Sequence, residues 1–240
     1  MWDYISYLVM VPMVYVAFTT LILGIIFKVY TVYKSPSIPA RLGVYPQDDI
    51  TPVGIIKDSL FWPVALKKSP LLWGFLMVFH LAIVFLIIGH MELISDFRVL
   101  QIIPHDVFLG AGALGMILIV STLYFLFRRF RSPFREISIP EDYLLLIILF
   151  FSILFGTIFH MSARYGSYSE LVKISAGDFR EYFMGLITFK PVLSYKLALA
   201  PHFIVLVLHV FFSNLFIILF PFSKMIHSLF IFFAISLKRK

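Results

Sequence analysis

The chain has 240 residues, of which 61% are apolar and only 14% are charged, against roughly a quarter charged in ordinary globular proteins. A mean hydropathy of +0.97 and 28 Phe residues exceed what one small core buries beneath a water-compatible surface. The composition therefore excludes a soluble globular domain and predicts an integral membrane protein.

The sequence contains no cysteine. Iron–sulfur clusters need Cys thiolates and covalent haem attachment needs a C-x-x-C-H motif, so neither forms in this chain alone. In so apolar a chain, the net charge of +7 indicates membrane topology and attraction to anionic membrane lipid rather than nucleic acid. The N-terminal Met1-Trp2-Asp3-Tyr4 carries an acid and no Lys or Arg. We therefore expect the first apolar run to be retained as a helix.

Five apolar runs have the length of about 20 residues with which a helix crosses a hydrocarbon core of about 30 Å. They predict an all-α protein with a single membrane domain over residues 1–240. The predicted spans are at about 5–27, 71–94, 107–127, 143–161 and 200–222. Because the apolar stretch after Lys224 is short and follows Pro221, we expect it to be a kinked helical extension at the interface rather than a sixth span.

Basic residues are divided unequally between the two sides of this topology. Segments 28–70, 128–135 and 224–240 hold fourteen Lys and Arg, and the loops of the opposite side hold six. Because basic residues accumulate in cytoplasmic loops, the N-terminus is predicted outside and the C-terminus in the cytoplasm. In the first inner segment, Thr51-Pro52 predicts the start of a short helix. Its apolar face would rest on the membrane or dock a partner.

Ionisable side chains inside spans are costly in lipid and are therefore candidates for function. His80 and His90 lie ten residues apart in the second span, and His209 and His227 lie eighteen apart in and beyond the fifth. Eighteen residues make five full helical turns, whereas ten leave two side chains about 80° apart. Since the two helices are antiparallel, His80 and His227 are expected toward the inner side and His90 and His209 toward the outer side.

Two opposed histidine pairs at different depths favour two stacked bis-histidine haems. Zinc is disfavoured because histidines ten residues apart on one helix are about 15 Å apart and cannot share a metal. Along straight axes the two intervals are about 15 Å and 27 Å, so tilt or Pro221 must absorb the difference. A non-redox membrane anchor, whose histidines only brace helices, stays open as an alternative. A transporter has no support from a discontinuous helix pair or an inverted repeat.

The segments around these histidines resemble a known family, the gamma subunit of respiratory nitrate reductase. The resemblance rests on Phe79-His80, Gly89-His90, His209 and the run Leu219-Phe220-Pro221-Phe222-Ser223-Lys224-Met225-Ile226-His227. It implies a five-helix dihaem cytochrome b that oxidises quinol. It also implies that His90 and His209 are axial iron ligands of an outer haem b, and that His80 and His227 ligate an inner haem b. A lysine that the family places near its quinol pocket is replaced here by Gly110.

Other parts of the chain are more similar to the cytochrome b subunits of the sulfite-reductase-associated (Dsr) complex and of membrane-bound heterodisulfide reductase. The proline-rich inner loop and the stretch Ser59-Leu60-Phe61 to Trp73 carry this resemblance. It implies a cytoplasmic iron–sulfur partner of heterodisulfide-reductase type, and leaves room for further membrane and outer-face subunits. The chain would then transfer electrons between menaquinol and that partner in a prokaryotic cytoplasmic membrane, in sulfite or sulfate respiration. The gamma subunit of nitrate reductase is the alternative.

Quinol oxidation also releases two protons, which need acceptors near the outer haem. Glu92, two residues beyond His90, and His160, at the outer end of the fourth span, are the best-placed titratable residues. An interfacial carboxylate at a helix end explains Glu92 equally well. Because two histidines fill both axial positions of a haem iron, such haems relay electrons rather than bind substrate.

Overall fold

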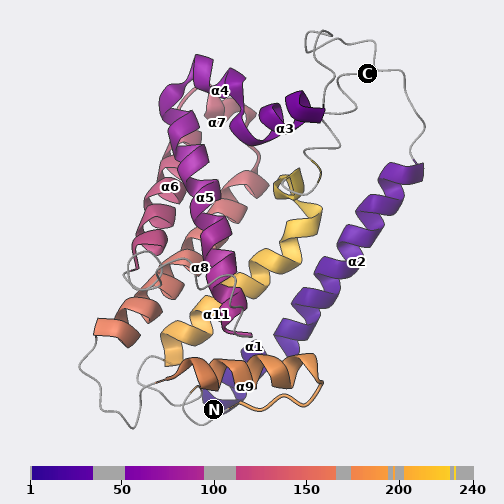
Figure 1. The fold of residues 1–240 in the computed structure, drawn as a ribbon, viewed down its shortest axis with the longest axis vertical. Coiled ribbons are helices and arrows are strands. Elements are labelled where there is room, and N and C mark those ends of the chain that lie inside the picture. The colour runs from indigo at the N-terminus through magenta and orange to yellow at the C-terminus, as the bar shows by residue number, and fades with distance from the viewer. Residues whose placement is uncertain are drawn as a thin grey trace.

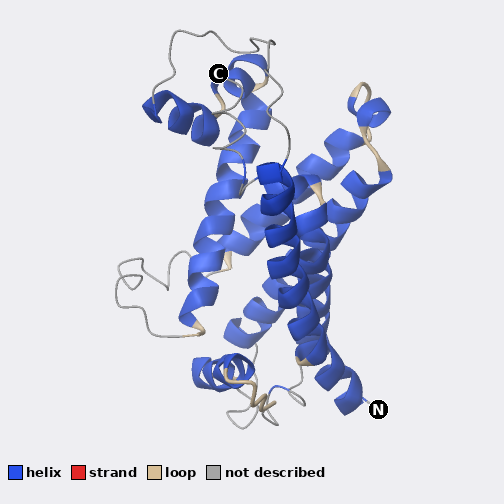
Figure 2. Ribbon diagram, turned by 90° about the vertical axis from the view of Figure 1, so that its right-hand side faces the viewer, coloured by secondary structure: helices blue, strands red, loops and turns tan. Residues whose placement is uncertain are grey.

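The computed structural model of the protein describes residues 2–34, 52–94, 112–165, 174–193, 197, 203–227 and 230. All regular structure within these ranges is helical (Figure 2). The longer helices are α1 (Trp2–Met10), α2 (Pro12–Lys34), α3 (Pro52–Phe61), α5 (Pro70–Glu92), α6 (Ala113–Arg129), α8 (Pro140–Tyr165), α9 (Ala176–Ile187) and α11 (Phe203–Leu219). The short elements are α4 (Pro63–Lys68), α7 (Phe134–Ile137) and two 3-10 turns, η5 (Phe220–Phe222) and η6 (Lys224–Ile226).

Four stretches of helix are long and apolar enough to cross a membrane: Tyr4–Lys34, Pro70–Glu92, Pro140–Ala163 and Ile204–Phe222. They correspond to the first, second, fourth and fifth predicted spans. The third, 107–127, overlaps α6, which has 17 residues, while residues 107–111 lie outside the described ranges. The protein is therefore an all-α, multi-pass membrane protein. A fifth span and the orientation in the membrane stay predictions.

The long helices pack in the order α5, α6, α8, α11 and α2. Helices α5 and α8 run in one direction along the bundle, and α2, α6 and α11 run in the other (Figure 1). One end of the bundle carries α3, α4 and α7, and the opposite end carries α1 and α9. These are called below the α4 end, which corresponds to the predicted inner side, and the α9 end, which corresponds to the predicted outer side.

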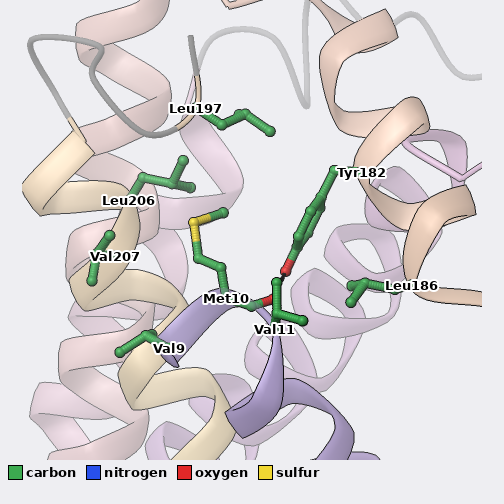
Figure 3. Packing of buried hydrophobic residues seen from close by; sticks show 8 residues of the cluster. All are labelled: Val9, Met10, Val11, Tyr182, Leu186, Leu197, Leu206 and Val207. Carbon is green, nitrogen blue, oxygen red and sulfur yellow. Dashed lines mark hydrogen bonds between the residues drawn. The ribbon is translucent and has the colours of Figure 1, made fainter. Parts of the chain in front are cut away.

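A buried apolar cluster closes the α9 end (Figure 3). It joins Val9, Met10 and Val11 to residues of α9 and α11, namely Tyr182, Leu186, Leu206 and Val207, and to Leu197. Pro12 lacks a backbone N–H, so the helical hydrogen-bond ladder is interrupted where α1 meets α2. Nearby carbonyls gain side-chain donors: the Tyr182 hydroxyl donates to Met10, and Asn214 Nδ2 donates to the Val9 oxygen at 3.0 Å. These bonds fix the first membrane helix against α9 and α11.

Helix α9 lies outside the long apolar runs and is not among the elements predicted from the sequence. A capping box starts it: the Ser175 side chain accepts from the Asp178 backbone N–H, and the Asp178 carboxylate accepts from the Ser175 backbone N–H. Such reciprocal bonds satisfy two backbone donors that a helix start otherwise leaves open. The Ser175-x-x-Asp178 spacing was therefore the sequence signal for this helix.

The short helix predicted from Thr51-Pro52 is confirmed as α3, which starts at Pro52. The residues of its expected apolar face, Val53, Ile56 and Leu60, are all exposed. The Trp73 indole N–H donates to the Phe61 carbonyl at 2.6 Å, which ties the end of α3 to the first turns of α5. Helices α3 and α4 therefore lie at the α4 end of the bundle, where α4 packs on α5 and the hydrogen bond from Trp73 holds the end of α3.

Candidate functional site

Both histidine pairs expected from the sequence are formed, each by one histidine of α5 and one of the α11–η6 segment. The ring centres of His80 and His227 are 6.4 Å apart at the α4 end. Those of His90 and His209 are 6.2 Å apart at the α9 end. An imidazole nitrogen lies about 2 Å from its metal and the ring centre about 1 Å further, so two imidazoles opposed across one metal have ring centres about 6 Å apart. Both pairs have this spacing.

All four imidazoles are oriented by a backbone carbonyl. The Nδ1 atoms lie 2.7 Å from the oxygen of Leu76 for His80, 2.8 Å from Leu86 for His90, 2.8 Å from Ser152 for His209 and 2.9 Å from Lys224 for His227. A carbonyl only accepts hydrogen bonds, so Nδ1 must carry the proton in each ring. The neutral imidazole then has its lone pair on Nε2, which is the tautomer that binds a metal.

Helix α5 carries one histidine of each pair, and the α11–η6 segment carries the other. In the described part of the chain, α5 packs closely on α4 and α6, and α11 packs closely on α1, α2 and α8, but α5 and α11 do not pack closely on each other. An apolar cluster built around Ala82, Leu118 and Ile153, with Phe216 against it, lies along this part of the bundle. The two pairs are separate sites, and in each of them one histidine is half-buried (His80 and His209) and the other is exposed (His227 and His90).

The helix that carries His209 is interrupted at Pro221 before it reaches His227. This break lets His227 lie opposite His80, although ten residues separate His80 from His90 and eighteen separate His209 from His227. Helix α11 ends at Leu219, and the chain continues as the 3-10 turns η5 and η6. Most of the helical extension expected after Lys224 lies outside the described residues. Ser223 between the two turns is extended, with φ −98° and ψ 168°. A Cβ on Gly24 would lie 2.6 Å from the Cβ of Pro221. Only glycine therefore lets α2 approach the break so closely.

At the α9 end, His209 is held by packing between two long helices. A Cβ on Gly156 of α8 would lie 2.8 Å from both Cε1 and Nδ1 of the His209 ring. The glycine therefore provides the surface on which this ring rests. One turn away, the hydroxyls of Ser152 and Ser213 are 2.7 Å apart and join α8 to α11. Neither Gly156 nor Ser152 was identified from the sequence, because their role depends on how α8 is rotated toward α11.

At the α4 end, different groups surround the pair. The Trp62 ring meets the His80 ring edge-on, with centres 4.8 Å apart, and its backbone is left-handed, with φ 41°. The Asp142 carboxylate lies 3.1 Å from Arg129 Nη1 and 3.2 Å from Lys224 Nζ. Together with His227, these three charged residues line one pocket. The ion cluster was not identified from the sequence, where its cations count only as basic loop residues.

The two residues predicted as proton acceptors both lie toward the α9 end. Glu92 is the last residue of α5, and its Oε1 atom is inaccessible to solvent. His160 is half-buried near the end of α8. Their role stays a prediction, and Gly110 lies outside the described residues.

Within the described ranges, no three His, Asp or Glu side chains converge as metal ligands. Each pair instead offers two imidazoles, enough to fill both axial positions of a haem iron. The orientation of all four rings and the spacing within each pair fit a haem at each position.

An apolar helical bundle with two opposed imidazole pairs stacked along it has the architecture of a membrane cytochrome. Residues 64–238 match the family described as Nitrate reductase gamma subunit, and the chain belongs to this family. The family consists of haem b-binding membrane cytochromes that transfer electrons in respiratory enzymes together with other subunits. No curated protein matches the sequence.

Proposed function

We propose that this chain is the dihaem cytochrome b subunit of a respiratory complex and passes electrons between quinol and a cytoplasmic iron–sulfur subunit. His80 and His227 would hold the inner haem b, and His90 and His209 the outer one. The observation that carries the proposal is the pair of imidazole spacings, 6.4 Å and 6.2 Å, with every Nδ1 atom bound to a carbonyl. It favours metal ligation over helix bracing, because bracing histidines need not pair at this spacing with every Nε2 left unprotonated.

A bis-histidine haem supplies reversible one-electron transfer and has no open coordination position. The protein's contribution is then to fix the ligands and exclude water. The carbonyl partners of Nδ1 set the ring orientation and increase the basicity of the ligating nitrogen. Phe79, next to His80, packs against the apolar cluster around Ala82, Leu118 and Ile153, and an apolar surrounding affects the redox potential of a haem.

We place quinol oxidation at the α9 end, next to the outer pair, with menaquinol as substrate and Glu92 and His160 as proton acceptors. Both residues occupy the same end of the bundle as His90 and His209. A carboxylate and an imidazole are side chains that accept protons near neutral pH when their surroundings tune them. Replacing Glu92 by Gln should slow the reduction of the haems by quinol while leaving both haem spectra intact. Unchanged reduction kinetics in Glu92→Gln and in His160→Ala would remove both residues from the mechanism.

We place the binding site of the cytoplasmic iron–sulfur partner at the α4 end. Lys34, Lys57, Lys67 and Lys68, in α2, α3 and α4, are found there together with Arg128 and Arg129 at the end of α6. Basic residues at the same end of the bundle as the inner pair favour a cytoplasmic orientation of this end and an acidic partner. Since this chain has no cysteine, the next redox centre must belong to another subunit. We propose an iron–sulfur subunit of heterodisulfide-reductase type, acting in sulfur-compound respiration in a prokaryotic cytoplasmic membrane.

The family match favours a second candidate, the gamma subunit of a respiratory nitrate reductase. Isolation of the native complex with mild detergent separates the two candidates by the subunits that co-purify. A heterodisulfide-reductase-like iron–sulfur subunit cross-linked to residues 52–68 supports the first, and a nitrate-reducing enzyme supports the second. A partner bound only at the α9 end would contradict the docking site in both.

The haem assignment is tested by absorption spectroscopy and a pyridine haemochrome assay on the purified full chain. We expect two non-covalent haems b per chain and split α-bands after reduction. A colourless protein would instead support a non-redox membrane anchor, and one haem per chain would refute one of the two ligand pairs.

A further inference from the structure

A cluster of three charged residues, Asp142, Arg129 and Lys224, lies beside the inner histidine pair. Asp142, in the first turn of α8, is only 6% exposed. Its Oδ2 atom accepts from the Ile139 backbone N–H at 3.2 Å and lies 3.1 Å from Arg129 Nη1. Lys224 Nζ lies 3.2 Å from each carboxylate oxygen. The buried carboxylate therefore joins the end of α6, the start of α8 and η6.

Such a carboxylate is tolerated because it is fully paired. Burial of an isolated charge is strongly unfavourable, whereas a buried charge with opposite charges and hydrogen-bond donors around it is accommodated. The two cations are more accessible than the carboxylate, with 34% of the Arg129 side chain and 62% of the Lys224 side chain exposed, against 5% for Asp142. Asp142 is thus the fixed centre of the cluster, and Lys224 is the group that it holds in place.

Lys224 connects this centre to His227. Its side chain binds Asp142, and its own carbonyl oxygen lies 2.9 Å from His227 Nδ1. The residue therefore links the carboxylate on α8 to the imidazole that faces His80. Ser223, on the other side of Lys224, caps the turn by accepting from the Met225 backbone N–H at 3.1 Å.

The segment that carries His227 has little internal support. The 3-10 turn η6 contains three residues, and a single 3-10 turn has poor hydrogen-bond geometry and no cooperative ladder. Its position must therefore come from contacts with other elements. His209 differs, because it lies within the 17 residues of α11.

We propose that Asp142 is a positioning residue for His227: by binding Lys224, it fixes the carbonyl that orients the His227 ring toward His80. This inference rests on the proposed haem ligation by His227. It predicts that loss of the Asp142–Lys224 ion pair changes the ligand geometry of the inner haem and leaves the outer haem unchanged.

The test uses the full chain in its native membrane, with low-spin ferric haem EPR and potentiometric titration. In Asp142→Asn, the low-spin line of the inner haem should move or broaden and its occupancy should fall, while the outer line is unchanged. Glu141→Gln removes the same charge from the neighbouring residue and is the matched control, expected to resemble the wild type. Unmoved lines for both haems in Asp142→Asn would overturn the proposal.

Lys224→Met separates positioning from a simple charge effect and also covers the case in which Asp142→Asn does not fold. Asp142→Asn removes a negative charge and Lys224→Met a positive one, so a pure field effect would shift the inner potential in opposite directions without moving the EPR line. Loss of positioning disturbs the inner EPR line in both variants. Lys224→Arg keeps the cation that binds Asp142 and should therefore keep the wild-type line. Opposite potential shifts with unmoved lines would contradict the proposal. Absence of haem b from the wild type would instead refute the proposed function itself.

Discussion

The two histidine pairs have nearly the same spacing, yet the protein holds them in different ways. At the α9 end, His90 and His209 both lie within long helices, and Gly156 and the Ser152 carbonyl of α8 receive the His209 ring. At the α4 end, only His80 lies within a long helix. His227 follows a three-residue turn that the Asp142–Lys224 ion pair ties to α8.

This difference has consequences for stability. Helix packing depends on shape and is insensitive to salt, whereas an ion pair with one exposed partner is weakened by screening. The inner site should therefore be the more easily disturbed of the two, by substitution and by ionic strength.

The largest expected effect is the loss of one haem on removal of a ligand. His209→Ala should abolish the outer haem and His227→Ala the inner one, because each leaves its partner imidazole without an opposing ligand. The haem content measured by pyridine haemochrome should fall from two per chain to one, with the remaining spectrum unchanged. His160→Ala is the control and should keep two haems. Two haems in His209→Ala would show that the ligand of the outer haem lies elsewhere.

The next effect should be confined to the outer pair. Gly156→Ala places a methyl group 2.8 Å from the His209 ring, and such overpacking costs about 1–3 kcal/mol. The outer EPR line should shift and the outer haem should be lost at lower temperature, with the inner haem unaffected. Gly74→Ala is a matched control on α5, because nothing lies within 4 Å of the added methyl group. Equal behaviour of the two variants would argue against the role of Gly156.

A smaller effect is expected from Trp62, whose ring packs against His80. Aromatic pairs of this kind contribute about 0.5–1.5 kcal/mol. Trp62→Leu should therefore weaken inner haem retention by up to about tenfold, measured by haem transfer to an apo-acceptor protein. Phe61→Leu, which changes an exposed neighbouring ring, should have no effect. A change in the outer haem alone would contradict the assignment of Trp62 to the inner site.

The smallest predicted effect concerns Tyr182 of α9, in the apolar cluster at the α9 end, and should leave both haems intact. Burial raises the pKa of the Tyr182 phenol above its usual value, which is about 10. Because the folded state favours the neutral phenol, its contribution to stability is complete below about pH 10 and is lost as the pH rises through the raised pKa.

Tyr182→Phe removes the hydrogen bond to Met10 and should lower the free energy of unfolding by about 1 kcal/mol at neutral pH. It should also remove part of the stability loss above pH 10. Thermal unfolding followed by circular dichroism at several pH values measures both effects. Tyr33→Phe, at a highly exposed tyrosine, is the control. An identical pH profile for Tyr182→Phe and wild type would contradict the buried phenol.

The length of the apolar runs predicted the long helices well, because a membrane span needs a long apolar run that little else in a protein resembles. Four spans are confirmed by length and composition. The short helix α3 is confirmed from its Thr51-Pro52 start. Helix α9 was missed because its capping box at Ser175 is a local signal with no long apolar run after it.

For the candidate site, the sequence identified the histidines and not the groups that hold them. The spacing of His80 and His90 follows from helix geometry, which is regular, whereas the position of His227 relative to His209 also depends on the break at Pro221. Asp142 and Lys224 are 82 residues apart, and Gly156 meets His209 only because of the rotation of α8. Contacts of this kind depend on tertiary packing, for which a single sequence has no periodic signal.

Potentiometric titration of the wild-type full chain, followed by its α-band absorbance and low-spin EPR lines, tests the central claim of two unequal bis-histidine haems most directly. The paired geometry predicts two one-electron components with different midpoint potentials and two distinct low-spin ferric lines, of which only one changes in His227→Ala. A single component, or no haem b signal at all, would contradict it.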